Sequence, residues 1–163
     1  MRVLVPFRST GKSRLASVLS DSGRLRVAAR MKEHVLSVCA EAGFEPEVLA
    51  APGLVDAIRA GLAERAEPTL IVMADLPLLT VADLLAIPTD RVAVAADRRD
   101  EGVNAVMMPT TTSVEVRLGG GPSLARYLQA APDACVIRRP GLAFDLDDAD
   151  DWSDLLAIDP SWK

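Results

Sequence analysis

Three aspartates in two short segments have the residue types and the spacing for metal-dependent chemistry. Asp75 directly follows the uncharged run 69–74, which is typical of a buried strand, and Asp145 and Asp147 alternate in the segment 144–147. Open α/β sheets bind ligands at the carboxyl ends of their strands, and residues i and i+2 of an extended segment point to the same side. If the two segments meet, three acids repel one another unless a hard cation neutralises them, and the usual occupant is Mg²⁺ shared with a phosphate. The aspartates therefore predict a Mg²⁺ site for nucleotide chemistry.

Each aspartate also has a purely structural interpretation. An aspartate before a proline-containing loop is a common turn residue, although the strand before Asp75 favours a functional role. Helix starts favour aspartate through capping and the helix dipole. On this interpretation the later acids belong to the start of the final helix, with Asp147 or Asp148 as N-cap and Asp150 and Asp151 in the first turn. Capping explains Asp145 poorly, because Asp145 lies inside an apolar strand pattern before the cap.

The segment 8–14 after the first predicted strand carries cations next to a predicted helix start. It contains Gly-Lys-Ser at 11–13, as a P-loop does, but a full P-loop needs a glycine at the position of Pro6. We therefore discount a strict P-loop. Lys12 and Arg14 would still lie at a helix N-terminus, which binds anions through its amides and its dipole. Two surface cations near a helix start are an equally good interpretation of these residues alone.

Two glycine-containing segments are weaker signals. They are Gly102-Val103-Asn104 and the loop 119–123, which holds Gly120 and ends in Ser123. Glycines before a helix N-terminus can cradle a phosphate, and Ser123 would add a hydroxyl. For either segment taken alone, a plain turn is the favoured interpretation.

Composition sets the broad class of the protein. The chain has 163 residues, of which 50% are hydrophobic and 25% charged, so we expect one globular domain over 1–163. The net charge of -5 argues against a nucleic-acid-binding surface. No apolar run is long enough to span a membrane, and residues 1–5 are typical of a first strand rather than a signal peptide, so a cytoplasmic location is expected. A single histidine and no CxxC argue against zinc.

Periodicity and turn residues predict an α/β fold. Strands are expected at 2–7, 47–51, 69–74, 91–96, 105–108, 134–138 and 142–146. Helices are expected at 12–20, 22–42, 54–65, after Thr80 to before Pro88, from the 119–123 loop to about Ala131, and at 149–158. Strands and helices alternate in the first half, as in a parallel sheet covered on both faces, and the closely spaced strands of the second half predict a mixed sheet there.

Taken in order, these motifs resemble the guanylyltransferase family of coenzyme F-420 biosynthesis, which acts on 2-phospholactate or phosphoenolpyruvate. The motifs that carry the resemblance are KSRL at 12–15, VMADLPLLT at 72–80, GVNA at 102–105, the glycine-serine loop, and GLAFDLDDADD at 141–151. The resemblance runs nearly end to end. It implies a Rossmann-like three-layer nucleotidyltransferase fold with a mostly parallel, partly mixed sheet. It also implies GTP and a small phosphorylated acid as substrates. Neither nucleic acid nor membrane is expected as a partner, and a homodimer is possible.

The resemblance implies roles for nine residues. Asp75, Asp145 and Asp147 would hold Mg²⁺, and Lys12 and Arg14 would face the triphosphate as the catalytic cations. The pocket of the three-carbon phosphate would be lined by Val103, Asn104, Gly120 and Ser123. The chain departs from the family at Val103, where the family usually has a threonine whose hydroxyl would touch the acceptor. The region between Gly43 and Pro68 is also shorter than in related chains.

The implied mechanism is attack of an acceptor phosphate oxygen on the α-phosphorus of GTP, with release of pyrophosphate. A phosphate monoester is mostly dianionic at neutral pH, so it needs no general base. Alignment and charge neutralisation then supply the catalysis. Two alternatives stay open. One is a P-loop-like kinase or switch protein that uses Lys12, Ser13 and Asp75, which leaves Asp145 and Asp147 unexplained. The other is a degenerate, non-catalytic homologue that binds nucleotide.

Overall fold

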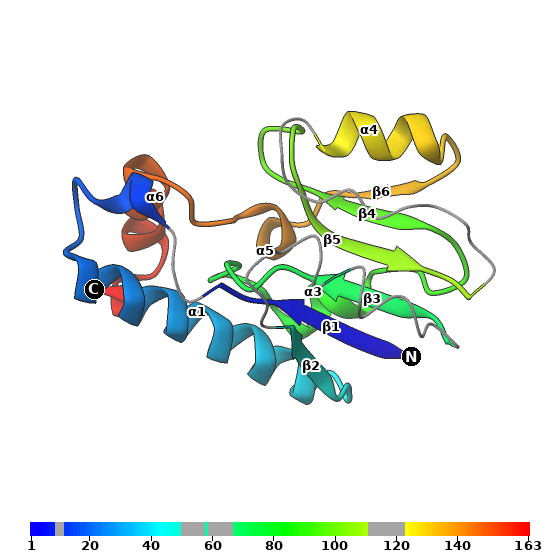
Figure 1. Ribbon diagram of the computed structural model, residues 1–163, viewed down its shortest axis with the longest axis horizontal. Helices are drawn as coiled ribbons and strands as arrows, with labels where there is room; N and C mark the ends of the chain where they lie inside the picture. Colours follow the sequence, from blue (N-terminus) through cyan, green and yellow to red (C-terminus); the bar gives the residue numbers. More distant parts are fainter. Residues whose placement is uncertain (9–11, 50–57, 59–66, 111–122) are drawn as a thin grey trace.

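The computed structural model describes the chain except for residues 9–11, 50–57, 59–66 and 111–122. Its described residues form one six-stranded sheet in the order β2-β1-β3-β5-β4-β6 (Figure 1). The strands are β1 (Arg2–Pro6), β2 (Pro46–Leu49), β3 (Thr69–Val72), β4 (Ala93–Ala96), β5 (Val103–Met108) and β6 (Cys135–Ile137).

Only β5 runs against the other described strands. β1 pairs in parallel with β2 and β3, and β4 pairs in parallel with β6, whereas β5 is antiparallel to both β3 and β4. Every residue of β3, β4 and β5 is buried, because both faces of the sheet are covered. The predicted mostly parallel, partly mixed sheet is confirmed.

Helices cover both faces of the sheet and give three layers (Figure 1). They are α1 (Asp21–Glu41), α3 (Val81–Leu85), α4 (Ser123–Ala130), α5 (Pro140–Ala143) and α6 (Ala149–Ile158), with short 3-10 helices η1 (Ser13–Leu15) and η2 (Pro160–Trp162). One core cluster joins Val3, Val5 and Val72 to α1, α3 and α5. A second cluster joins Leu4, Ile71 and Val94 to α4 on the opposite face. The α/β fold class is thus confirmed.

A third core cluster lies beyond the sheet and packs the C-terminal helices α6 and η2 against η1 and α1. Leu15 of η1, Met31 of α1 and Leu155 of α6 are buried together in it, with Leu146 and Trp162. In Figure 1, α6 correspondingly lies beside the start of α1. This packing brings the 144–147 segment next to the loop that carries Lys12, because both segments lead directly into the cluster.

Two predicted elements are wrong. Residues 12–20 do not form an α-helix, because the extended backbone of Ser20, whose hydroxyl accepts a hydrogen bond from the Gly23 amide, starts α1 at Asp21. Residues 142–146 do not form a strand, because Pro140 occupies the first turn of α5, a position that its fixed φ favours. The predicted helix at 54–65 lies outside the described residues apart from residue 58. None of the described helices is long and apolar enough to cross a membrane.

Candidate active site

The two acidic segments meet at the carboxyl end of β3. Asp75 follows that strand after Met73 and Ala74, and its loop is anchored by Leu76, which is fully buried. The backbone amide of Leu146 donates a hydrogen bond of 3.1 Å to the Asp75 carbonyl oxygen. The contact fixes the 144–147 segment against this loop, although 144–147 is not a strand of the sheet.

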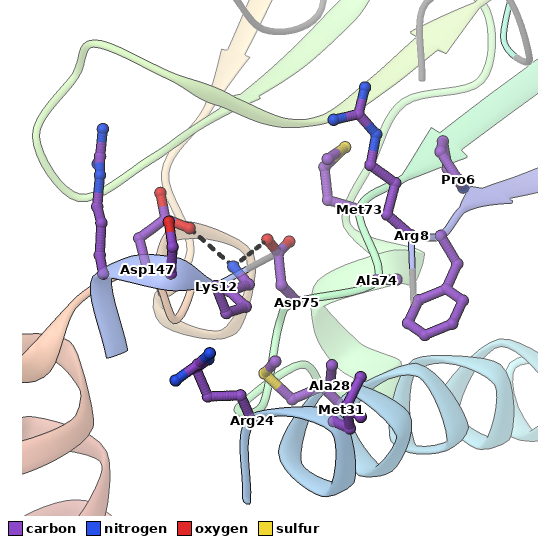
Figure 2. A pocket seen from close by; sticks show the side chains of 14 residues that line it. Pro6, Arg8, Lys12, Arg24, Ala28, Met31, Met73, Ala74, Asp75 and Asp147 are labelled. Carbon is purple, nitrogen blue, oxygen red and sulfur yellow. Dashed lines mark hydrogen bonds and ion pairs between the residues drawn. The ribbon is translucent and has the colours of Figure 1, made fainter. Parts of the chain in front are cut away.

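Lys12 joins Asp75 to Asp147 (Figure 2). Its Nζ lies 2.6 Å from Asp75 Oδ2 and 2.7 Å from Asp147 Oδ1, so the two carboxylate oxygens are no farther apart than the sum of these distances. The Lys12 side chain is 16% exposed, and those of Asp75 and Asp147 are 23% and 40% exposed. The backbone of Lys12 is left-handed, with φ of 55°, an uncommon conformation for a residue with a side chain.

The electrostatics of the cluster favour a charged lysine. Burial opposes the charge of Lys12, but the carboxylates of Asp75 and Asp147 outweigh burial and raise the pKa of its ammonium. Burial raises the pKa of Asp145 to about 6, and the charges of Asp75 and Asp147 add to that effect. The charges of Asp75 and Asp147 therefore act on Asp145, which lies in the same short segment as Asp147.

Asn104 supports Asp145 from the neighbouring strand β5. Its Nδ2 donates to the Leu142 carbonyl oxygen at 3.0 Å and to Asp145 Oδ1 at 3.3 Å. Asn104 is buried, and its hydrogen bond favours the ionised form of Asp145, which partly offsets the rise in the pKa of that carboxyl. The amide of Asn104 therefore orients an acid of the cluster, a role that its position in the sequence did not suggest.

The donors of the cluster fit a hard cation. Asp75 Oδ1 is buried and has no hydrogen-bond partner, which is costly for a carboxylate oxygen. Carboxylate oxygens are the ligands that Mg²⁺ prefers. As the described side chains lie, no group of three or more acidic, histidine or cysteine residues is placed to hold a metal ion, and the Lys12 ammonium takes the position between Asp75 and Asp147. A metal-binding role for the three aspartates therefore stays a prediction.

A cavity of about 330 Å³ opens beside the cluster, between β1, β3 and α1 (Figure 2). Its polar wall holds Asp75, Asp147 and four cations, namely Arg8, Lys12, Arg14 and Arg24. Lys12 and Arg14 were predicted from the sequence. Arg8 and Arg24 were not, because nothing in the sequence distinguishes an arginine that faces a cavity from one on the surface. A cavity with several cations and a pair of acids at one wall suits a phosphate chain with a bound cation.

The predicted acceptor residues lie away from this cavity. Val103 is 6% exposed and packs in the core cluster under α4, and Ser123 is buried at the start of α4. Neither they nor Asn104 line the cavity. Gly120 lies outside the described residues. An acceptor-binding role for these four residues stays a prediction.

Comparison with known proteins gives consistent relatives. The chain is 30% identical over 185 residues to a phosphoenolpyruvate guanylyltransferase from Sphaerobacter thermophilus, with 93% of this chain and 89% of the relative covered. It is 30% identical over 144 residues to a 2-phospho-L-lactate guanylyltransferase from Methanosarcina mazei, with 76% and 69% covered. A phosphoenolpyruvate guanylyltransferase from Chloroflexus aggregans is 28% identical over 177 residues, with 85% and 87% covered. No family model matches the chain.

Solved structures agree on the fold. A protein from Desulfovibrio desulfuricans, assigned as a nucleotide-diphospho-sugar transferase, superposes with a TM-score of 0.74 at 11% identity and covers 96% of this chain and 87% of its own. The inositol-1-phosphate CTP transferase of T. maritima gives a TM-score of 0.50 at 12% identity, with 93% and 91% covered. At such low identity these likenesses show a nucleotidyltransferase-like fold and nothing more.

Proposed function

The chain belongs to the family of phosphoenolpyruvate and 2-phospho-L-lactate guanylyltransferases, and we propose that its reaction takes place at the Lys12–Asp75–Asp147 cluster and the adjoining cavity. The reaction is transfer of GMP from GTP to a phosphorylated three-carbon acid in coenzyme F-420 biosynthesis, with release of pyrophosphate. We also propose that residues 1–163 form a single domain. The finding that all the described strands belong to one sheet supports this proposal.

One observation carries the location of the site. Acids from two distant segments, Asp75 and Asp147, meet on one cation at the wall of a cavity that three arginines also line. A P-loop kinase or switch protein gives no reason for Asp147 to lie there. The three sequence relatives described above also argue against a kinase, because all three are guanylyltransferases.

The cations of the cavity would bind the triphosphate. Arg8, Arg14 and Arg24 surround the space next to Lys12, so their charges can neutralise the β- and γ-phosphates and the departing pyrophosphate. Arg24 is held in place, because its guanidinium donates to the Leu19 carbonyl oxygen and to Asp21. The positions of these side chains supply alignment, which is the main requirement of phosphoryl transfer.

The acceptor needs no proton removed. Its phosphate is mostly dianionic at neutral pH and can attack the α-phosphorus directly. Consistent with this, the single histidine of the chain, His34, lies outside the cavity lining, with its Nε2 2.9 Å from the Leu79 carbonyl oxygen.

Asp75, Asp145 and Asp147 would hold Mg²⁺, with Asn104 orienting Asp145. When bound, the cation would neutralise charge on the reacting phosphates. The acceptor would bind towards β5 and α4, where Val103, Asn104 and Ser123 lie, and would be phosphoenolpyruvate or 2-phospho-L-lactate.

Product analysis tests the proposal. The protein is incubated with Mg²⁺, each of the four nucleoside triphosphates, and either phosphoenolpyruvate or 2-phospho-L-lactate. We expect a GMP adduct of one acid and an equal amount of pyrophosphate, with GTP alone as donor. GDP or ADP as product would instead favour a kinase, and the absence of any product would favour a non-catalytic homologue.

The Asp145→Asn variant is the matched control for that assay. The substitution is nearly isosteric and removes one negative charge from the acid cluster, so we expect turnover to fall by about a hundredfold or more while the fold is kept. Normal turnover in this variant at saturating Mg²⁺ would show that Asp145 is a structural residue.

A further inference from the structure

Asp151 is a buried carboxylate that no step of the proposed reaction uses. It lies in the first turn of α6, and its side chain is only 2% exposed. Its Oδ2 accepts hydrogen bonds from the backbone amides of Asp147, at 2.7 Å, and Asp148, at 2.9 Å. Asp151 therefore fixes the backbone at the residue whose carboxylate binds Lys12.

The other carboxylate oxygen of Asp151 faces two arginines. Its Oδ1 accepts from Arg98, in a close ion pair, and from Arg99 Nη2 at 3.3 Å. Both arginines belong to the turn between β4 and β5, which Asp97 closes by accepting hydrogen bonds from the amides of Arg99, Glu101 and Gly102. Asp151 thus links the Asp147 segment to the turn that leads into β5.

Arg98 holds the same acidic segment at further points. Its backbone amide donates to the Ala143 carbonyl oxygen at 3.0 Å, and its guanidinium carbon lies 4.8 Å from the centroid of the Phe144 ring. Its Nη1 also donates to Asp154 at 2.8 Å. The turn therefore contacts residues both before and after Asp145.

Capping of α6 does not account for this arrangement. Asp148 is the N-cap, and its side chain accepts from the amides of Asp150 and Asp151. A capping box needs only one return bond, which the Asp148 amide donates to the Asp151 carboxylate. The extra bond from the Asp147 amide and the ion pairs of the buried Asp151 carboxylate with Arg98 and Arg99 go beyond it. Burying a carboxylate is costly unless it is paired and hydrogen-bonded.

We propose that Asp151 is a positioning residue, which sets the place of Asp147 in the acid cluster and couples it, through Arg98, to the β4–β5 turn at the acceptor side. The proposal rests on the proposed function, because it is the catalytic cluster that Asp151 would position. It predicts that loss of Asp151 weakens cation binding through Asp147, in addition to any effect on the fold.

Asp151→Asn and Asp154→Asn form a matched pair for the test. Each removes one carboxylate from Arg98, but Asp154 is 57% exposed and makes no hydrogen bond to the Asp147 backbone. In Asp151→Asn, the amide group faces either the two backbone N–H groups or the arginines, so donors oppose donors. We expect Mn²⁺ binding, followed by the electron paramagnetic resonance signal of free Mn²⁺, to weaken about tenfold, the effect of losing one hydrogen bond to a charged group. Asp154→Asn should stay within about twofold of the natural protein.

A double-mutant cycle shows whether Asp151 acts through Asp147. In an Asp147→Asn background, adding Asp151→Asn should leave Mn²⁺ binding unchanged, because the group being positioned is already gone. Additive losses would overturn the proposal, because they would show a general structural effect. If Asp151→Asn does not fold, Arg98→Gln replaces it in the cycle, with the same non-additivity expected.

Amide hydrogen exchange separates this proposal from the proposed function. Exchange at the Asp147 and Asp148 amides should be faster in Asp151→Asn and unchanged in Asp154→Asn, and this readout needs neither metal nor substrate. Unchanged exchange in Asp151→Asn would overturn the positioning role even in an active enzyme. Failure of the natural protein to bind Mn²⁺ or to transfer GMP would contradict the proposed function. In that case amide exchange, together with the unfolding free energies of the same Asp147→Asn and Asp151→Asn variants, would still decide the role of Asp151.

Discussion

Asp145 shows how the cluster sets the charge of its members. Its carboxyl lies beside Asp75 and Asp147 and is buried, so its pKa rises from 3.8 to about 6. The lysine between the other two acids does not contact it in any described hydrogen bond or ion pair. Asp145 is thus the least compensated of the three acids.

The pH dependence of stability follows from that shift. Between pH of about 4 and 6 the folded protein holds a proton on Asp145 that the unfolded chain has released, so ionisation in this window lowers stability as pH rises. We expect the natural, metal-free protein to lose stability relative to Asp145→Asn over this window, with a constant difference above it. Urea denaturation of both proteins in EDTA at several pH values from 4 to 7.5 measures the difference. Parallel pH profiles would contradict the shift.

A threonine at position 103 tests whether this residue faces the acceptor or the protein core. Val103 and Val106 lie on β5 in the same core cluster, 6% and 0% exposed. Replacing either by threonine buries a hydroxyl, and we expect a loss of about 1–3 kcal/mol in unfolding free energy for both variants. Denaturant titration compares them. If Val103→Thr is as stable as the natural protein and Val106→Thr is not, position 103 faces ligand or water, as the family resemblance implied.

Single residues were the most predictable feature of the site. Asp75, Asp145, Asp147 and Lys12 were predicted to share one site, and the structure places Lys12 between Asp75 and Asp147, with Asp145 beside them. Asp151 was correctly predicted in the first turn of a helix, but its additional contacts depend on a turn more than fifty residues away. Local patterns carry no information about such a partner.

Elements were predictable where one local signal dominates. A helix was expected after Thr80, and the Thr80 side chain caps α3 by accepting a hydrogen bond from the Asp83 amide. The 142–146 strand was wrong, because its apolar residues pack against two different elements. Leu142 belongs to the core under the sheet and Leu146 to the cluster with α6, so the segment bends between them. An apolar run alone does not reveal that its residues enter different cores.

Gly141 shows how tightly α5 is packed. A Cβ atom there would lie 2.1 Å from Asp83 Oδ2 and 2.4 Å from the Leu78 carbonyl oxygen, so α5 would have to move away from α3. We expect Gly141→Ala to lower the unfolding free energy by about 3 kcal/mol. Turnover should fall as well, because the adjacent Leu142 carbonyl oxygen accepts a hydrogen bond from Asn104.

Gly43→Ala is the control for Gly141→Ala. Gly43 has a φ of 84° but nothing within 4 Å of the added Cβ, so the cost is only the backbone strain, about 1 kcal/mol. Urea denaturation of the two variants gives the comparison. Equal losses would show that α5 accommodates the methyl group and that the packing against Asp83 is loose.

At the scale of the whole molecule, the site exists only because three distant segments meet. Lys12 contacts residues 63 and 135 positions away along the chain, and the third core cluster packs α6 and η2 against η1 and α1 beside it. The net charge of -5 predicted a surface unsuited to nucleic acid, and it says nothing about four cations that gather at one cavity. Those cations come from the loop after β1, from η1 and from α1, so only the folded chain assembles them.

Lys12→Met is therefore expected to have opposite effects on stability and on cation binding. Without the ammonium, Asp75 and Asp147 face each other unpaired, and we expect the metal-free protein to lose about 1–3 kcal/mol of unfolding free energy. The same variant should bind Mn²⁺ about tenfold or more tightly, because a positive charge that competes for the two carboxylates is gone. Mn²⁺ should then raise the melting temperature of Lys12→Met more than that of the natural protein, since ligand binding to the folded state stabilises it.

Arg14→Met is the matched control. Arg14 lines the same cavity and makes no ion pair in the described structure, so its loss should change Mn²⁺ binding little. Weaker Mn²⁺ binding in Lys12→Met would mean that the lysine holds the acids in place for the metal instead of competing with it.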